Sequence, residues 1–463
     1  MARLGDVAGL REATVDRRDA TPVLMVAEKF PPHARSGGTR SMYFARHLPE
    51  FGYRPVVLAA PVVSGDPSDP ELLQQMPDDI DVWRPMPVLG VIQKMKRSAV
   101  AAIRARLPRR HASPGAGRGA AGVARGSSAA RSAPPTPLQR TITWLIYWHL
   151  DWLPPAFVRG VAVGRQRQVR LVWATAPHVR SLVLGYVLSR ALNRPLVVDL
   201  RDPWTYGSLW LPASPLAATI ERAWSRTILN AAALVVFTSP FTQHEMEARF
   251  PRLRGKSLTI TNGFSMDDEA IEPLRGGFED KCLLRHCGVL NDRRRPDVLL
   301  RGLELAIDRE PALRSSIHLE LVGDLGGNQP SLSRSGIADC VSALGRVSRR
   351  HSLALMRGAD VNVLLQTIAT GTDVIAGKAF DYLAARRPIL GIVDPQGGDA
   401  WLLRQTGNLV VSYEREQEIA EAIADLYAGW KCGQLPRPSS DLAEYERRRL
   451  TERLAGAFDR LLQ

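Results

Sequence analysis

Short apolar runs alternate with longer segments of mixed polarity through most of this chain, and that alternation constrains the fold more than any other feature. Runs rich in Val and Leu occur at 22–27, 53–60, 170–175 and 195–200, with segments of helical length between them. Continuous apolar runs of this kind are typical of strands that are buried on both faces of a sheet. Their alternation with helices predicts an α/β fold built on parallel sheets.

The same alternation begins again in the second half of the chain, with apolar runs at 282–290, 317–323, 361–366 and 388–393. The segment between the two series, residues 265–280, is acidic and rich in turn-forming residues, so we interpret it as a domain linker. The sequence thus predicts a disordered tail at 1–20, one Rossmann-like domain at 21–268, a second at 276–440 and a helical segment at 441–463.

The positive charge of the chain is concentrated in one segment. The net charge is +14, but eleven basic residues and no acidic residue lie between Lys94 and Arg140, and the other 50 basic residues nearly balance 47 acidic ones. This segment is rich in Gly, Ala, Ser and Pro and lacks hydrophobic periodicity, so we expect a disordered insertion at about 94–140. Because the excess charge is not spread over a structured face, the composition argues against nucleic acid as a partner.

The aromatic segment after the insertion has two interpretations. Residues 141–157 include four aromatic side chains between Trp144 and Trp152. Aromatic rings beside cationic residues suit the interface of an anionic membrane, so residues 94–152 are a candidate contact with such a surface. Alternatively, the aromatic residues belong to a helix that packs within the first domain.

Nothing in the sequence predicts export or a membrane-spanning helix. No apolar run approaches the roughly eighteen residues that a spanning helix needs, and residues 1–20 lack the apolar core of a secretory signal. The four cysteines make no C-x-x-C pair and no metal-ligand spacing, which indicates free, buried thiols in a reducing compartment. The expected location is therefore the cytoplasm.

The segment DVIAGKAFDYLAARRPIL, residues 373–390, carries the most specific pattern. It holds two carboxylates, Asp373 and Asp381, with Lys378 between them. One carboxylate at a helix start can accept hydrogen bonds from both hydroxyls of a vicinal diol such as that of a ribose. With the small and aromatic residues around it, the segment resembles the donor-binding motif of GT-B-fold retaining glycosyltransferases, the family-4-like enzymes that use nucleotide sugars.

That resemblance extends from about residue 21 to 460, apart from the basic insertion. It implies two Rossmann-like domains whose parallel sheets face each other across a cleft, with a C-terminal helix that crosses back to the first domain. It also implies that Asp381 binds the ribose of the donor and that Asp373 lies near the transferred sugar. Both positions depart from the family, which usually has Glu there.

Two cations match the positions at which the family stabilises the departing diphosphate. Lys378 lies within the motif, and Arg294 follows Gly288 in GVLNDRRRP, which resembles the glycine-loop-arginine segment that opens the second domain. Arg293 and Arg295 are its neighbours, so the register is open by one residue. Negative charge grows on the diphosphate oxygens in the transition state, and fixed cations aimed there lower the barrier.

Further donor contacts follow from the resemblance. Gly37 and Gly38, in FPPHARSGGTR, match the first strand–helix loop, where glycines let backbone N–H groups approach a phosphate or a sugar. Gly323 matches a turn beside the diphosphate, and Arg346 and Val347 match the loop whose backbone meets the base of the donor.

The acceptor side is assigned to DLRDPW, residues 199–204, which ends a predicted strand of the first domain. Asp199 and Asp202 are candidates to orient acceptor hydroxyls, with Arg201 paired to either; a purely structural ion pair in the loop is the alternative. His178 follows another strand and matches a histidine that hydrogen-bonds the transferred sugar, although a plain loop histidine would have the same pattern.

The resemblance implies a retaining glycosyltransferase of the hexosyltransferase type, which moves a sugar from a nucleotide sugar to a glycan or lipid-linked acceptor. The setting would be cell-surface polysaccharide or glycolipid synthesis, in the cytoplasm or at the inner face of the membrane. No cofactor and no divalent metal is expected, and the D-x-D triplet at 79–81 is interpreted as a polar loop. The alternatives are a nucleotide-sugar epimerase or hydrolase of the same fold and a non-catalytic binding subunit.

Overall fold

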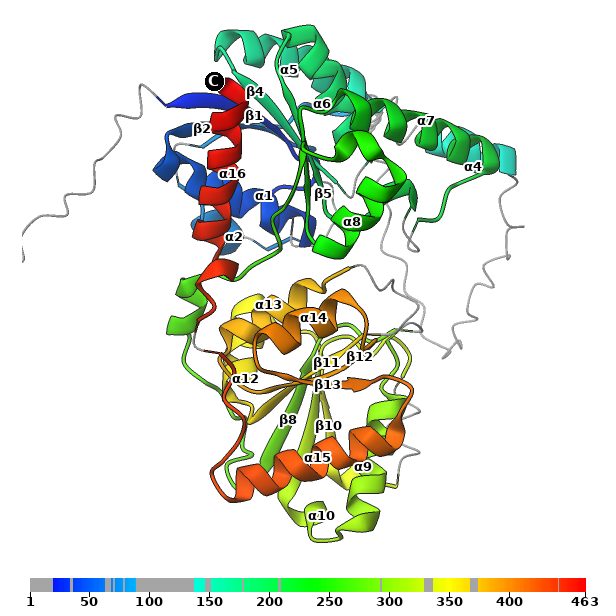
Figure 1. The fold of residues 1–463 in the computed structure, drawn as a ribbon, viewed down its shortest axis with the longest axis vertical. Coiled ribbons are helices and arrows are strands. Elements are labelled where there is room, and N and C mark those ends of the chain that lie inside the picture. Colours follow the sequence, from blue (N-terminus) through cyan, green and yellow to red (C-terminus); the bar gives the residue numbers. More distant parts are fainter. Residues whose placement is uncertain are drawn as a thin grey trace, which may run out of the picture.

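The protein is described here by a computed structural model, in which two α/β lobes lie one above the other (Figure 1). The structure describes residues 20–33, 36–62, 68–69, 71–77, 80–88, 137–145, 151–176, 179–206, 210–291, 294–328, 336–366, 374–439 and 441–463. The predicted tail therefore lies outside the described residues except for Ala20, and so does most of the predicted basic insertion.

The first lobe is built on a seven-stranded parallel sheet with the order β3-β2-β1-β4-β5-β6-β7. Its strands are β1 (Thr21–Val26), β2 (Tyr53–Leu58), β3 (Asp81–Trp83), β4 (Leu171–Thr175), β5 (Leu196–Leu200), β6 (Leu234–Phe237) and β7 (Ser257–Thr259). The connecting helices are α1 (Ser36–His47), η1 (Leu48–Phe51), α2 (Glu71–Gln74), α4 (Pro137–Trp144), α5 (Leu153–Gln166), α6 (Val179–Leu192), η3 (Trp204–Tyr206), α7 (Pro215–Ala231), α8 (Pro240–Arg249), η4 (Pro251–Leu253) and η5 (Met266–Ala270).

The second lobe is built on a six-stranded parallel sheet with the order β10-β9-β8-β11-β12-β13. Its strands are β8 (Cys282–Cys287), β9 (Ile317–Val322), β10 (Val341–Leu344), β11 (Val361–Leu365), β12 (Ile389–Val393) and β13 (Leu409–Ser412). Its helices are α9 (Asp297–Arg309), α10 (Leu313–Ser316), η6 (Ala338–Cys340), α12 (Arg349–Gly358), α13 (Gly377–Ala384), α14 (Gly398–Gln405) and α15 (Glu416–Lys431). Two parallel α/β sheets confirm the predicted fold class.

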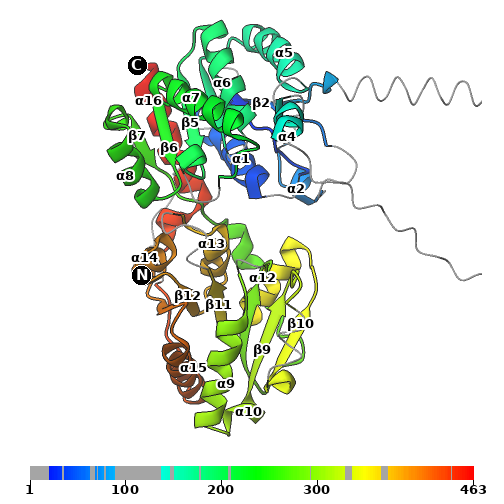
Figure 2. The same ribbon diagram turned by 90° about the vertical axis from the view of Figure 1, so that its right-hand side faces the viewer.

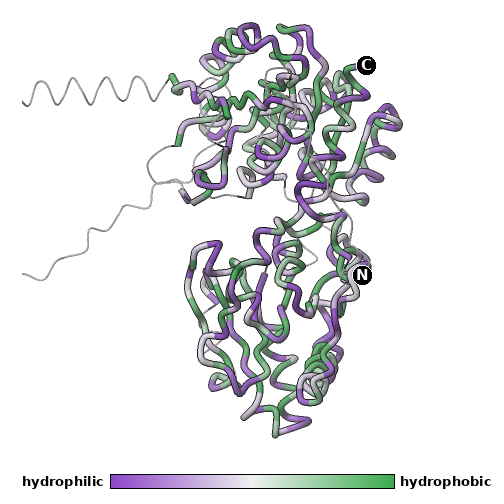
Figure 3. The backbone as a smooth tube through the Cα atoms, turned by 90° about the vertical axis from the view of Figure 1, so that its left-hand side faces the viewer, coloured by the Kyte–Doolittle hydropathy of each residue, from purple (hydrophilic) through white to green (hydrophobic). Residues whose placement is uncertain are grey.

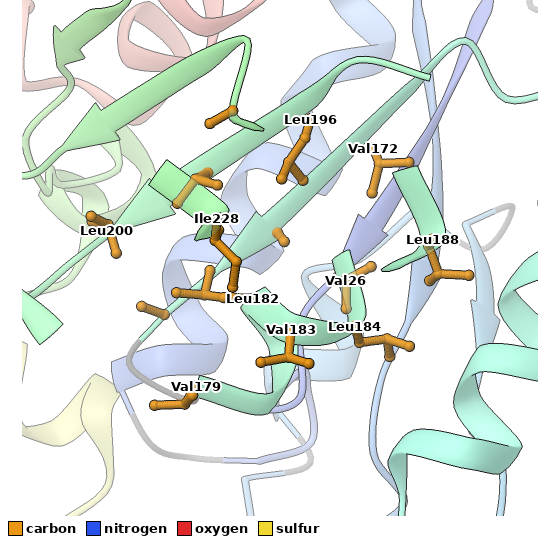
Figure 4. Packing of buried hydrophobic residues seen from close by; sticks show 14 of the residues in the cluster. Val26, Val172, Val179, Leu182, Val183, Leu184, Leu188, Leu196, Leu200 and Ile228 are labelled. Atoms are coloured by element: carbon orange, nitrogen blue, oxygen red, sulfur yellow. The ribbon is translucent and has the colours of Figure 1, made fainter. Parts of the chain in front are cut away.

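Helices cover both faces of each sheet, which explains why the strands are apolar throughout. In the first lobe, Leu182 and Leu188 of α6 belong to one buried cluster with Val172 of β4 and Leu196 of β5 (Figure 4). A second cluster on the opposite face includes Trp173 of β4. Both lobes show hydrophobic and hydrophilic residues interspersed along their helices (Figure 3), as expected when one side of a helix packs on a sheet and the other meets water.

The end of the chain returns to the first lobe. After α15, the chain forms η8 (Ala443–Tyr445) and α16 (Arg447–Leu462), and α16 lies beside α1 (Figures 1 and 2). Phe458 is fully buried there, with its ring in an edge contact with Tyr53 at 5.3 Å between centroids. Where the chain crosses between lobes, Phe264 N–H donates to Tyr445 O and Arg447 N–H donates to Phe264 O, at 3.1 and 2.9 Å. The two crossings are thus paired like neighbouring strands.

One predicted boundary differs from the structure. Residues 137–140, at the end of the predicted insertion, belong to α4. Helix α7 begins at Pro215 after Ser214, which caps it by accepting a hydrogen bond from Ala217 N–H at 3.1 Å. The prediction that all cysteines are buried is wrong for Cys432, which is exposed, while the other three are buried free thiols.

The aromatic segment is buried where the structure describes it. Trp144 and Trp152 are 5% and 1% exposed. The indole N–H of Trp144 donates to Glu221 of α7 at 2.9 Å. These two side chains therefore pack within the first lobe, as one of the two interpretations held; residues 146–150 lie outside the described part. None of the helices in the described ranges combines the length and hydrophobicity of a membrane span.

We expect Gly263→Ala to weaken the paired crossing. A Cβ at this position would lie 2.3 Å from Tyr445 O and 2.6 Å from Cδ1 of Leu450, so the backbone must shift. Overpacking of this kind costs about 1–3 kcal/mol, and we expect the midpoint of thermal unfolding, followed by circular dichroism, to fall. Gly456→Ala is the control: it lies in α16 with only the end of Arg460 near, at 4.0 Å, and should stabilise the helix by about 1 kcal/mol. Equal midpoints for the two variants would contradict the close packing.

Candidate functional site

A cavity of about 830 Å³ lies between the lobes and is lined by residues of both. Thr39, Arg40 and Tyr43 of α1 contribute from the first lobe, and Asn262 and Gly263 from the crossing segment. The opposite wall comes from the loops that follow β8, β9 and β11 and from the first turns of α12 and α13.

The topology of the second sheet explains why the cavity is there. The strand order reverses between β8 and β11, which are neighbours although β9 and β10 lie between them in the chain. Ligands of open α/β sheets bind at such a point, beyond the carboxyl ends of the strands. Gly288 after β8, Gly323 after β9 and Gln366 after β11 all line the cavity, so the wall is made by those ends.

The wall of the cavity is strongly basic. Among the described lining residues, seven are cationic and three are acidic: Arg40, Arg201, Arg294, Arg346, Arg349, Lys378 and Arg447 against Asp69, Asp324 and Asp381. A cleft lined with one sign of charge concentrates ligands of the opposite sign. The cavity therefore suits an anionic ligand.

Helix α13 brings Lys378 and Asp381 to the cavity. Gly377, Lys378 and Asp381 line it, while Phe380 and Tyr382 of the same helix are fully buried. The predicted motif is therefore amphipathic around one short helix, with its polar residues toward the cavity. Asp373 lies outside the described residues.

Asp381 is paired with an arginine that the sequence analysis did not single out. Arg349, at the start of α12, lies 3.3 Å from Asp381 Oδ1 and donates to both oxygens of Asp268 in η5, at 3.0 and 2.8 Å. Burial opposes the charge of Asp268, but its hydrogen bond with Arg349 holds its pKa below the ordinary value. The guanidinium of Arg349 thus links α13, which carries the acid predicted to bind the ribose, to η5 in the segment between the lobes.

Arg294 also lines the cavity, where its Nε donates to Gln366 Oε1 at 2.9 Å. Burial lowers its pKa, against the opposing charge of Asp399. Asp399 itself is 4% exposed and accepts a hydrogen bond from Ala376 N–H, the residue before α13, at 2.8 Å. Asp399 was not predicted, and it fixes the segment that leads into α13.

The backbones of the two predicted glycines Gly288 and Gly323 pack directly against each other. Gly323 has φ +128°, and a Cβ there would lie 2.2 Å from Gly288 O, so only glycine fits. Gly288 N–H donates to Val322 O at 2.8 Å. The ends of β8 and β9 therefore turn at the cavity without side chains between them. Arg346 and Val347 also line the cavity, with Arg346 donating to Asp324 at 2.6 Å.

The first lobe places its candidate residues differently from one another. Asp199 is fully buried, does not line the cavity, and accepts hydrogen bonds from Arg40 Nη2 at 2.9 Å and Thr175 Oγ1 at 2.7 Å. Its ion pair is structural, and the cation is Arg40 and not the expected Arg201. Arg201 lines the cavity, whereas Asp202 does not.

The structure says less about the three remaining candidates of the first lobe, Gly37, Gly38 and His178. Gly38 packs in the first turn of α1, where a Cβ would lie 3.1 Å from His33 O, and it is not among the described residues that line the cavity. Gly37 lies in the same turn, and His178 lies outside the described residues.

The geometry resembles that of solved structures over nearly the whole chain. The chain superposes on HepE from Anabaena in complex with UDP with a TM-score of 0.59 and 14% identity, covering 95% of this chain and 100% of that one. A glycosyltransferase from Rickettsia africae gives 0.60 and 11%, covering 96% and 99%. Sucrose-phosphate synthase from Thermosynechococcus elongatus gives 0.53 and 14%, covering 96% of each chain. This chain has the GT-B fold.

Similarity in sequence covers a smaller part of the chain than similarity in structure. No protein-family model matches the chain. D-inositol 3-phosphate glycosyltransferase from Streptomyces griseus is 31% identical over 132 residues, which is 24% of this chain and 28% of that protein. The chain thus matches less than a third of the length of this curated relative.

The GT-B cleft also contains residues that the sequence analysis missed. Arg447 of α16 is stacked over the ring of Tyr43 at 3.6 Å, and both line the cavity. His286 of β8 lines it from the other lobe. These residues come from segments far apart in the sequence, so no local pattern marks them; Arg447 is one of three consecutive arginines.

Among the residues that the structure describes, no group of three or more His, Cys, Asp or Glu side chains could hold a metal ion. Asp81, of the D-x-D triplet, is paired with Arg167 at 2.8 Å.

We expect Asp399→Asn to stabilise the protein in a pH-dependent way. Burial raises the pKa of Asp399 to about 6 from a usual 3.8, so ionising it costs stability as pH rises from about 4 to about 6. The amide cannot ionise and keeps an oxygen for Ala376 N–H. The variant should therefore be about 3 kcal/mol more stable than wild type at pH 7 and show little difference near pH 4, measured by urea unfolding at each pH. Asp425→Asn on the exposed side of α15 is the control, and a constant difference between pH 4 and 7 would refute the shift.

Proposed function

We propose that the protein is a glycosyltransferase that transfers a sugar from a nucleoside-diphosphate sugar with retention of configuration. The observation that carries the proposal is that Asp381, Lys378 and Arg294 line one basic cavity between the lobes of a GT-B fold. HepE, which shares the fold, has been crystallised with UDP and with UDP-glucose. UDP-glucose is therefore the first donor to test.

The proposed roles follow the charges. The carboxylate of Asp381 accepts hydrogen bonds from the hydroxyls of the donor ribose. When the donor binds, these hydroxyls compete with Arg349, which lies 3.3 Å from Asp381 Oδ1. Arg346 and Val347 border the base, and Gly288 and Gly323 let the diphosphate approach the backbone. Arg294 and Lys378 stabilise the charge that grows on the diphosphate, so the transfer needs no divalent metal.

In the proposed reaction, the acceptor hydroxyl oxygen forms a bond with the anomeric carbon on the face from which the diphosphate departs. The carbon–oxygen bond to the diphosphate breaks and its electron pair leaves with the nucleoside diphosphate. The acceptor proton passes to the departing phosphate oxygen. Asp373 and His178 remain candidates for contacts with the transferred sugar, and Arg201 for the acceptor side. Gly37 and Gly38 are proposed to contribute through the turn that they form.

Two other functions of the same cavity make different predictions. A nucleotide-sugar epimerase or hydrolase would give an epimer or free sugar from the donor alone. A binding subunit would take up nucleotide without turnover. Product analysis of UDP-glucose with and without a glycan or lipid-linked acceptor separates all three.

Replacing Lys378 or Asp381 by Ala should lower sugar transfer strongly. Removing a cation from the leaving diphosphate costs about 10²- to 10³-fold in kcat, so Lys378→Ala should lower kcat, whereas Asp381→Ala should mainly weaken donor binding. Steady-state kinetics with UDP-glucose, or with the nucleotide sugar that gives the largest thermal shift, measures both. Lys431→Ala and Asp425→Ala on the exposed side of α15 are matched controls. Unchanged kinetics in both site variants would disprove the assignment.

The acceptor is proposed to be lipid-linked and to be reached at an anionic membrane surface. Leu138, Ile142 and Leu145 in and after α4 are 68%, 47% and 43% exposed, and their spacing places them on one helix face. The strongly basic sequence 94–136 directly precedes this helix. Apolar side chains beside clustered cations favour binding to anionic lipid.

We expect the full chain to sediment with phosphatidylglycerol vesicles more than with phosphatidylcholine vesicles. Changing the three exposed α4 side chains to Ser, or deleting residues 94–136, should reduce the bound fraction several-fold. Leu409→Ser, which changes an exposed leucine of the second lobe, should not. If the wild-type protein stays in the supernatant with both lipids, this part of the proposal fails.

A further inference from the structure

His286 carries a buried ring nitrogen for which the described part of the structure offers no hydrogen-bond partner. The side chain is 3% exposed and lies at the carboxyl end of β8, where it lines the cavity. Its Nδ1 lies 2.9 Å from Val363 O on β11, and its Nε2 is the unpartnered atom. Leaving a buried polar atom unpaired costs about 1–3 kcal/mol, so the position requires an explanation.

The bond to Val363 fixes the tautomer of the ring. A carbonyl oxygen only accepts hydrogen bonds, so Nδ1 carries the proton. Burial, together with the charges of Lys378 and Arg294, lowers the pKa of His286 to about 4, and the ring is neutral at pH 7. A neutral ring with its proton on Nδ1 has a bare lone pair on Nε2. That nitrogen is therefore an acceptor waiting for a donor.

The surroundings leave room for a ligand at that nitrogen. A Cβ built on Gly288 would lie 2.9 Å from His286 Nε2 and 3.6 Å from Lys378 Cε, so the missing side chain of Gly288 keeps the space between them open. Lys378 makes no hydrogen bond to this nitrogen in the structure. The lone pair thus lies beside the two cations proposed for the diphosphate, within the same cavity.

We propose that His286 Nε2 accepts a hydrogen bond from a hydroxyl group of the sugar that the donor carries. The inference rests on the proposed nucleotide-sugar function and adds a residue that distinguishes the sugar nucleotide from the nucleoside diphosphate. A diphosphate is deprotonated at neutral pH and offers only acceptors, which cannot pair with a lone pair. The ribose hydroxyls and the base are assigned to Asp381 and to Arg346 and Val347, so within the ligand the sugar is the remaining source of a donor.

Two substitutions separate the two nitrogens of the ring. His286→Asn keeps an N–H near the position of Nδ1, which can still donate to Val363 O, and removes the acceptor at Nε2. His286→Gln extends an amide oxygen toward the position of Nε2 and gives up the bond to Val363. The Asn variant should bind the nucleotide sugar about tenfold more weakly and the nucleoside diphosphate as wild type does. The Gln variant should recover most of the loss.

The measurement is isothermal titration of wild type and both variants with matched pairs: UDP and UDP-glucose, ADP and ADP-glucose, GDP and GDP-mannose. The pair that wild type binds most tightly is used for the comparison. Equal weakening of both members of that pair in the Asn variant would show that His286 only positions Lys378, and unchanged binding of both would show that it contacts nothing; either result overturns the inference. If wild type binds no member of any pair, the proposed function itself fails.

A second measurement does not depend on the stability of the variants. In wild-type protein labelled with ¹⁵N-histidine, His286 should give the signals of a neutral ring protonated at Nδ1. Its Nε2 signal should shift more on addition of the nucleotide sugar than on addition of the nucleoside diphosphate, which brings charge to Lys378 and Arg294 but no hydrogen-bond donor to the ring. A shift of the same size with both ligands, or with neither, would contradict a bond to the sugar.

Discussion

The cavity depends on the point at which the neighbouring strands β8 and β11 stop pairing with each other. Their register ends at the pair of Asn362 with Arg285, and beyond it the two strands diverge. Side chains supply the hydrogen bonds that the ladder no longer makes: the hydroxyl of Tyr382 accepts from Cys287 N–H at 2.8 Å and lies 3.2 Å from Val363 O. His286 reaches the same carbonyl. Buried backbone groups must be paired, and these two rings supply partners for the backbone of β8 and β11 where the register stops.

The tyrosine in the α13 motif therefore has a structural reason that is distinct from that of its neighbours. Tyr382 is fully buried and holds α13 against the end of β8, while Lys378 and Asp381, on the same helix, line the cavity. Because one rigid helix carries both sets, the position of the polar residues is set by the packing of the apolar ones. This is how a short sequence motif can specify a site geometry.

The fold class could be predicted from the sequence because buried parallel strands are continuous apolar runs, and that signal is local. Short elements such as α14 and β13 carry too few residues for a periodicity to show, and they were missed. The polar pairs were missed for another reason. Arg349 meets Asp268, and Asp199 meets Arg40, across long sequence separations, so their partners follow from tertiary packing and not from any spacing. The sequence could bring Lys378, Asp381 and Arg294 together, and the structure places all three at one cavity. This was possible because they belong to short motifs of a family whose members share a fold.

The ion pairs of Arg349 connect the cavity to η5, in the segment that joins the two lobes. Asp268 lies in η5, close to the paired crossing at Phe264, and Arg349 contacts both it and Asp381. Since buried or half-buried ion pairs are costly to leave incomplete, Arg349 holds these two carboxylates at fixed positions relative to each other. One side chain thus ties α13, which carries Asp381 at the cavity, to η5 in the segment between the lobes.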